Sequence, residues 1–209
     1  MDTLQMLAEK AKELTDPSPA MRQLNAMKQS ICRNSRLAIF SFYAFVECFV
    51  NSVGEDFACR NPGLPARDQE LLRGSNKGSH LSTKQKIQKF AEIVRGDGSR
   101  PLILTDPKQR KEPFTSFVQH VKELRDAAAH YAKTKATIWL SPGDWLAPAN
   151  QACDTCMEVA RQFWHACYPE RGMPDYLGWL ETERHVKIAE DRLAAEHDDT
   201  WLQCVNAQT

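Results

Sequence analysis

The sequence lacks several features that assign a function at once. Its 27 Lys and Arg side chains balance 27 Asp and Glu side chains, so no overall basic field favours nucleic acid. It has no Gly-rich phosphate loop of the Walker type and no Gly-x-Ser-x-Gly elbow. These absences argue against a P-loop nucleotidase and an α/β-hydrolase, and they leave any nucleic-acid role to a local patch of charge.

The sequence also predicts no disulfide framework, no leader and no membrane span. The 7 cysteines are odd in number and scattered, which predicts reduced thiols in a cytoplasmic protein. Residues 1–14 have early acids and no apolar core region, so we expect no signal peptide. The apolar run 37–53 is shorter than the roughly 20 residues of a spanning helix, and it contains Glu47 and Asn51. We therefore expect a helix buried in a soluble bundle, without membrane contact.

Helical periodicity dominates what is present. No segment alternates convincingly with period two, so the predicted class is all-α, a helical bundle of about five to six helices with a long central helix. Ser82-Thr83 is expected to cap one helix that Gly96 closes. We expect a bundle over 1–175 and, over 176–209, a C-terminal helix and tail packed on it. The expected helices cover about 2–15, 19–59, 68–73, 84–94, 108 or 113 to 131, 148–167 and 180–197.

Chemically useful residues gather at the end of the helix that we expect to finish at 131. Arg125-Asp126-Ala127-Ala128-Ala129-His130 places a cation, a carboxylate and an imidazole around three alanines, which favour helix and add no bulk. With Val121 at the centre of the apolar stripe, Arg125 falls about 40° away, at the edge of the buried face. Asp126 and His130 fall about 140° and 180° away, so we expect both to point outward as an interacting i,i+4 pair.

A polar seam interrupts the apolar run of the long helix. Tyr43, Glu47, Asn51 and Glu55 recur every four residues and so share one face. An ionised Glu47 in apolar surroundings needs a partner. We expect the seam to face the helix that ends at 131 and Glu47 to form an ion pair with Arg125, because a guanidinium can hold a carboxylate with two bonds. A structural ion pair without chemistry is the alternative interpretation.

The spacing Arg-polar-x3-His followed by Tyr131, together with the run Phe45–Asn51 on an earlier long helix, resembles the HEPN superfamily. That superfamily consists of small all-α domains, many of them metal-independent ribonucleases. The resemblance covers about residues 25–170. It implies a two-fold dimer in which Arg125 and His130 of each subunit line a shared cleft, where RNA is cut without metal or another cofactor.

The resemblance also implies roles for individual residues. Neutral and protonated His130 would take the proton of the ribose 2′-OH and protonate the leaving oxygen, and Arg125 would stabilise the phosphorane charge. Asp126 would orient His130, and Tyr131 would stack on a base or donate to a phosphate. The predicted catalytic residues are Arg125, His130, Asp126 and Glu47. The predicted substrate-binding residues are Tyr131, Asn51, Lys133 and Lys135.

The partners implied are RNA, such as tRNA or mRNA, a second copy of the chain, and a cognate antitoxin or other regulatory protein. Toxin–antitoxin systems and anti-phage defence are the contexts in which such domains often act. The alternative function is a non-catalytic HEPN-like module that binds a partner protein or nucleotide. A third possibility is the regulated half of a two-component system, with Tyr131 as a control point.

Two other groups of residues invite a functional interpretation. Cys153-x2-Cys156 with His165 and Cys167 has the composition of a zinc site, but the cysteines lie at helical spacing and favour a buried stripe, so we predict no metal. Basic residues would either line a phosphate track beside His130 or form a solvated face. They are Lys84, Lys86, Lys89, Arg95, Arg100, Lys108, Arg110 and Lys111.

Overall fold

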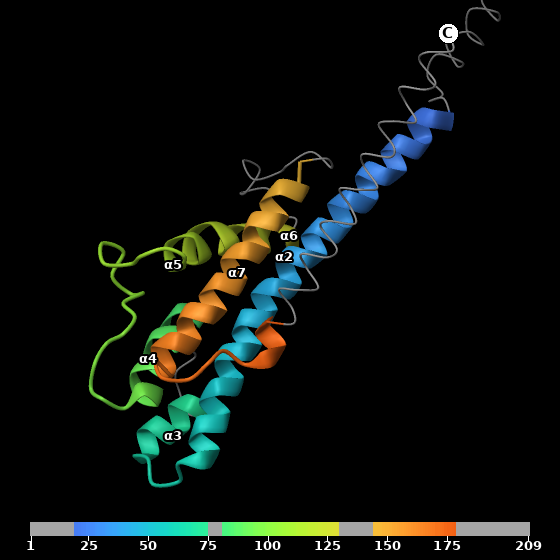
Figure 1. Ribbon diagram of the computed structural model, residues 1–209. Helices are drawn as coiled ribbons and strands as arrows, with labels where there is room; N and C mark the ends of the chain where they lie inside the picture. The colour runs from blue at the N-terminus through green and yellow to red at the C-terminus, as the bar shows by residue number, and fades with distance from the viewer. Residues whose placement is uncertain (1–18, 75–80, 130–143, 179–209) are drawn as a thin grey trace, which may run out of the picture. The chain divides into compact units, whose positions relative to one another are not determined.

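The computed structural model describes residues 19–74, 81–129 and 144–178, and the described elements are all helical (Figure 1). The predicted all-α class with one long helix is confirmed. The helices expected at 2–15 and 180–197 lie outside the described residues. The chain divides into two compact units, Met1–Tyr168 and Pro169–Thr209. The helices of the first unit are α2 (Pro19–Arg60), α3 (Ala66–Arg73), α4 (Thr83–Arg95), α5 (Phe114–Ser116), the π-helical turn η1 (Phe117–Val121), α6 (Lys122–Ala129) and α7 (Leu146–Cys167).

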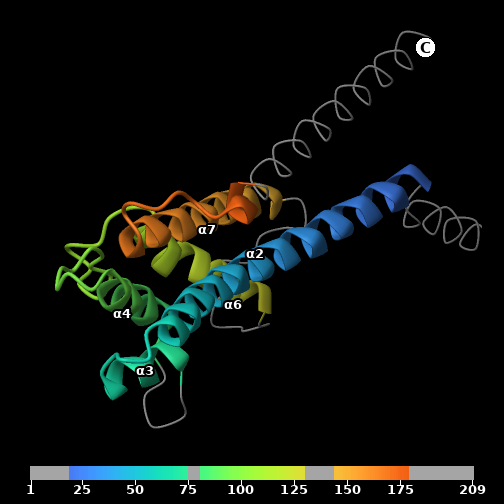
Figure 2. The ribbon, with the colours of Figure 1, turned by 60° about the horizontal axis from the view of Figure 1, so that its bottom comes forward.

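Helix α2 is the spine of the first unit, and α7, α6, α3 and α4 all contact it (Figures 1 and 2). Its fully buried residues recur at helical spacing through Ile39, Val46 and Val50, so one apolar face turns toward the other helices. The helix ends at Arg60. The next residue, Asn61, closes its last turn, because the Asn61 backbone N–H and side-chain amide both donate to the carbonyl of Phe57, at 3.1 and 2.8 Å. The observed bounds agree closely with the expected 19–59.

Aromatic side chains fix how α2 meets its neighbours. The Phe49 ring contacts Phe163 of α7 edge-on, with centroids 6.1 Å apart, and the Tyr43 ring stacks on Phe117 at 5.2 Å. Gly54 lets α4 come close, since a Cβ built there would lie 2.7 Å from the ring of Phe90. These contacts hold α4, η1 and α7 against the C-terminal half of α2.

Helix α4 begins and ends as its sequence indicates. The Gln85 side-chain oxygen accepts a hydrogen bond from the Ser82 backbone N–H at 2.9 Å, and Gly96 ends the helix in the left-handed conformation, with φ +71°. Gln88 is a buried polar residue whose Oε1 accepts from the backbone N–H groups of Leu104 and Thr105, at 3.0 and 3.2 Å. These bonds tie the connection after α4 to the bundle.

The single helix expected from 108 or 113 to 131 is wrong in detail. The segment is divided into α5, the π-helical turn η1 and α6. A π-helical turn holds an extra residue, so the apolar stripe shifts its phase there. The sequence places Phe114, Phe117, Val118, Val121, Leu124 and Ala128 at helical spacing; of these Phe114, Phe117 and Val121 are buried, the other three are half-buried, and Ala127 is buried in place of Ala128.

Within the described part of the chain, one helix, Leu24–Arg60, is long and apolar enough to cross a membrane by length and composition. The core helix of a soluble protein passes the same test. The apolar run 37–53 contributes Ile39, Val46 and Val50 to the core, with none of their surface exposed. The expectation that α2 makes no membrane contact stays a prediction.

Candidate functional site

Arg125 projects from α6 onto an aromatic surface. Its guanidinium carbon lies 4.4 Å from the centroid of the Tyr43 ring, which stacks in turn on Phe117. The Arg125 side chain is 26% exposed, so it lies at the edge of the buried face. This is the position that the helix phase predicted.

The expected ion pair between Glu47 and Arg125 is wrong. Glu47 Oε1 accepts a hydrogen bond from Thr83 Oγ1 at 2.5 Å, and no ion pair within 4.0 Å joins Glu47 to Arg125 in the described part of the chain. Thr83 Oγ1 also lies 3.3 Å from the Tyr43 hydroxyl. Thr83 lies in the first turn of α4, which approaches this face of α2. Its hydroxyl therefore binds the Glu47 carboxylate, which we had expected to pair with Arg125.

The remainder of the polar seam likewise faces α4 and α3. Asn51 Oδ1 accepts from Lys86 Nζ at 2.9 Å, and Glu55 Oε1 lies 4.0 Å from Arg73 Nε. Tyr43 is the seam residue whose ring contacts Arg125. The four-residue spacing therefore identified one common face but not the helices that cover it.

Arg125 and Glu47 nevertheless line one cavity of about 440 Å³. Cations outnumber carboxylates around it, because Lys84 and Lys122 line it together with Arg125 and Glu47. This excess of positive charge favours an anionic group such as a phosphate. The remaining lining residues are Tyr43, Leu81, Ser82, Thr83, Phe117 and Val118.

Asp126 is less exposed than the helix phase predicted. Its side chain is 19% exposed; its Oδ2 accepts from Lys122 Nζ at 2.8 Å, and its Oδ1 lies 3.3 Å from Arg125 Nε. Two flanking cations hold the carboxylate along the helix, and the expected pairing of Asp126 with His130 lies outside the described residues. Arg125 Nε is buried and makes no hydrogen bond within the described residues.

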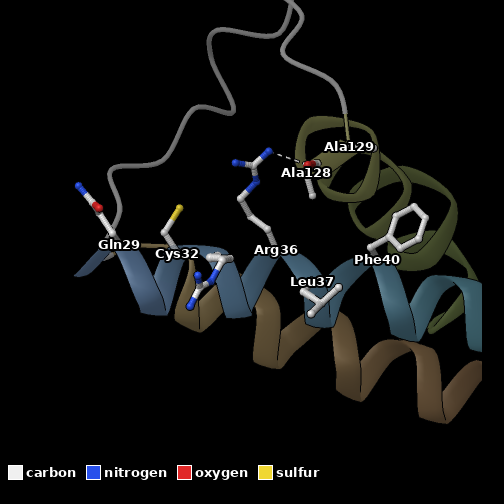
Figure 3. A pocket seen from close by; sticks show the side chains of 8 residues that line it. Gln29, Cys32, Arg36, Leu37, Phe40, Ala128 and Ala129 are labelled. Carbon is white, nitrogen blue, oxygen red and sulfur yellow. Dashed lines mark hydrogen bonds between the residues drawn. The ribbon is translucent and has the colours of Figure 1, made fainter. Parts of the chain in front are cut away.

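The other predicted site residues lie outside the described residues: His130, Tyr131, Lys133 and Lys135. Helix α6 ends at Ala129, and His130 is the next residue. Arg36 Nη2 donates a hydrogen bond to the Ala128 carbonyl at 2.6 Å. Arg36 thus holds the end of α6 against α2 (Figure 3).

A second cavity, of about 470 Å³, lies at this junction, and sequence reasoning missed it (Figure 3). The signal that could have found it is charge, since the stretch 19–46 has four basic residues and no Asp or Glu. The basic residues are Arg22, Lys28, Arg33 and Arg36. The lining residues are Gln29, Cys32, Arg33, Arg36, Leu37, Phe40, Ala128 and Ala129.

The cysteines of α7 belong to the core, as their spacing predicted. Cys153, Cys156 and Cys167 are buried, and burial raises the pKa of the Cys156 and Cys167 thiols above the ordinary value. Ala160 and Phe163 are buried beside them, and His165 is exposed. Among the described residues, no three or more His, Cys, Asp or Glu side chains lie together in a cluster that could hold a metal ion.

Much of the basic cluster on and after α4 is paired. Lys89 Nζ lies 2.7 Å from Glu92 Oε2, and Arg95 Nε lies 2.7 Å from Asp97 Oδ2. Lys86 binds Asn51, as described above. Lys84 is the member of this cluster that lines the cavity of Arg125.

Comparisons with protein-family models, with curated proteins and with solved structures find no match to this chain. The resemblance to the HEPN superfamily therefore depends on the residues that carry it.

Proposed function

We propose that the chain is a metal-independent endoribonuclease of HEPN type that cuts RNA by 2′-OH attack at a composite dimer site. The observation that supports this best is the cavity that brings Arg125 and Glu47 together with Lys84 and Lys122. Arg125 belongs to the helix that ends one residue before His130. RNA, a second copy of the chain and a regulatory protein are the proposed partners.

The contacts of Arg125 suit the chemistry. Glu47 accepts from Thr83 and does not pair with Arg125, and Asp126, which contacts Arg125 Nε at 3.3 Å, is shared with Lys122, so the terminal nitrogens of the guanidinium remain for a phosphate. In the reaction the 2′-oxygen forms a bond to phosphorus, and the bond from phosphorus to the 5′-oxygen breaks, which leaves a 2′,3′-cyclic phosphate. One His130 takes the 2′-OH proton and the His130 of the second subunit protonates the 5′-oxygen, while Arg125 stabilises the phosphorane.

Glu47 and Asp126 act through their neighbours in this proposal. Glu47 positions Thr83 at the cavity wall. Asp126 orients Arg125 and Lys122, which line the same cavity. Asn51 accepts a hydrogen bond from Lys86, so in this proposal Asn51 positions Lys86 and the lysine contacts the substrate. Tyr131, Lys133 and Lys135 follow the motif directly and would contact the RNA beyond it.

The test is cleavage of total RNA and tRNA in EDTA by the wild type, His130→Ala and His120→Ala. His120 is an exposed histidine of η1 and so gives a matched control. We expect His130→Ala to lower the cleavage rate by about a hundredfold or more, because it removes the general acid and base. His120→Ala should cut like the wild type and leave cyclic phosphate ends. Normal cleavage by His130→Ala contradicts the proposal.

A second candidate function has one observation in its favour. Helix α2 exposes Leu24, Met27, Ile31, Leu37 and Phe40, and exposed apolar surface often marks a binding site. A non-catalytic module that binds a protein or nucleotide would use such a surface. Wild-type protein that is monomeric by light scattering and inert toward every RNA would favour this function, because a monomer cannot form the shared cleft.

A further inference from the structure

The groove between α2 and the end of α6 has the side chains of a nucleotide-binding surface. Phe40 is 48% exposed and Leu37 is 62% exposed, so an aromatic ring and an aliphatic side chain face solvent at the same cavity (Figure 3). Arg33 is exposed beside them and has no hydrogen-bond or ion-pair partner among the described residues. An exposed ring next to an unpaired guanidinium fits a base and its phosphate.

The basic residues of this part of α2 are arranged by the helix. Gln29, Arg33, Arg36 and Phe40 follow one another at intervals of four, three and four residues, so they share one face. At about 100° per residue, Lys28 lies about 140° from Arg33 around the helix. One face of α2 therefore combines an aromatic ring with two guanidinium groups, and Lys28 offers an equal charge on another face.

Charge favours RNA over a second helix as the occupant of this groove. The stretch 19–46 has no Asp or Glu, so its field attracts a phosphate backbone and repels a second copy of the same stretch. Arg36 adds a second positive charge to the wall of the groove, where its Nη2 donates to the Ala128 carbonyl at 2.6 Å.

The groove also adjoins the proposed reaction centre. Ala128 and Ala129 form its wall, and His130 is the next residue. We infer that this groove binds the nucleotide beside the scissile phosphate of single-stranded RNA, with the base stacked on Phe40 and the phosphate on Arg33. The position beside the scissile phosphate rests on the proposed function, whereas the binding of single-stranded RNA does not.

The experiment is the binding of a fluorescent 2′-O-methyl RNA 12-mer to the full chain in EDTA, measured by anisotropy over a range of salt concentrations. This RNA cannot undergo 2′-OH attack, so binding is separated from cleavage. We expect Phe40→Ala and Arg33→Ala each to weaken binding roughly tenfold, as the loss of one stacked base or one phosphate contact does. Lys28→Ala, which removes the same charge from another face, should bind within about twofold of the wild type.

The salt dependence distinguishes the two contacts. Arg33→Ala should reduce the slope of log affinity against log salt by about one, whereas Phe40→Ala should leave the slope unchanged. Equal losses in Lys28→Ala and Arg33→Ala would mean a general basic field and contradict the groove. Wild-type affinity in both groove variants, or a wild type that does not bind the RNA, also overturns the inference. The inference is also wrong if Phe40→Ala and Arg33→Ala change the oligomeric state of the protein but not its RNA affinity, since the groove would then be an interface between copies.

The inference and the proposed function fail separately. If His130→Ala cuts RNA normally while Phe40→Ala and Arg33→Ala lose binding, the groove stands and the catalytic proposal is wrong. If His130→Ala abolishes cleavage while both groove variants bind like the wild type, the reverse holds. Thermal unfolding by circular dichroism controls for folding, and the exposure of Phe40 and Arg33 predicts little change.

Discussion

The two halves of α2 have similar apolar residues and opposite surroundings. In the C-terminal half Val46 and Val50 are completely buried, and close contacts join Tyr43 to η1, Phe49 to α7 and Gly54 to α4. In the N-terminal half Leu37 is 62% exposed and Met27 is 53% exposed. The described helices gather along the C-terminal half (Figure 2).

The difference shows that hydropathy alone does not assign a role to a helix segment. Burial of the C-terminal half stabilises the fold through its apolar contacts, while the N-terminal half exposes aliphatic side chains and the Arg33 guanidinium to solvent. The cavity of Arg125 lies beside the C-terminal half, and the groove of Arg33 and Phe40 lies where the two halves meet. Substitutions in matched pairs can test whether the boundary between the regions is real.

The largest expected contrast is between two phenylalanines of the same helix. Phe49 is 4% exposed and contacts Phe163 and Trp164, so Phe49→Ala should lower the free energy of unfolding by about 3–5 kcal/mol. Phe40 is 48% exposed, so Phe40→Ala should change it by about 0.5 kcal/mol or less. Urea denaturation followed by circular dichroism measures both. Similar losses in the two variants would show that Phe40 is also covered.

Local sequence was sufficient to predict the helices themselves. The expected 19–59, 84–94 and 148–167 agree with α2, α4 and α7 within one or two residues at each end. Capping and termination depend on adjacent residues, such as Ser82 with Gln85 or Gly96 at a left-handed position, so they can be seen in sequence. The buried stripe of α7 was predictable for the same reason.

The partners across helices were not predictable from spacing. Glu47 was expected to meet Arg125, but Thr83 from the first turn of α4 is its partner. The π-helical turn before α6 changed which residues are buried, and two cations drew Asp126 along the helix. The Arg36 bond to Ala128 joins residues 92 positions apart, so no local pattern shows it. Tertiary contacts of this kind decided the geometry of the candidate site.

A smaller effect tests the close approach within the buried half. A Cβ at Gly54 would lie 2.7 and 2.8 Å from two atoms of the buried Phe90 ring and 3.1 Å from the Leu72 carbonyl oxygen. Alanine is otherwise preferred to glycine in a helix by about 1 kcal/mol, so the sign of the change reports the contact. We expect Gly54→Ala to destabilise by about 1–3 kcal/mol, because the core is overpacked.

Gly63 provides the control for that substitution. A Cβ there meets nothing within 4 Å, so Gly63→Ala should stabilise the protein by about 0.4–1 kcal/mol through the unfolded state. Thermal unfolding of the three proteins gives the comparison. Stabilisation by Gly54→Ala would mean that α4 does not come close to α2, and the boundary of the buried half would then lie nearer Val50.

The smallest contrast concerns the two arginines where the halves of α2 meet. Arg36 is half-buried, donates to the Ala128 carbonyl at 2.6 Å and lies with its guanidinium carbon 5.7 Å from the Trp145 ring centroid. Arg36→Met keeps an apolar stem but removes that hydrogen bond and the contact with Trp145, so it should lower the free energy of unfolding by about 1 kcal/mol. Arg33→Met removes an exposed charge without a described partner and should change it by less than about 0.5 kcal/mol. Urea denaturation separates the two arginines, and equal stability of both variants would show that Arg36 does not anchor α6. Together with the RNA-binding measurements, a loss of stability in Arg36→Met alone would place the boundary between scaffold and binding surface at residues 33–36.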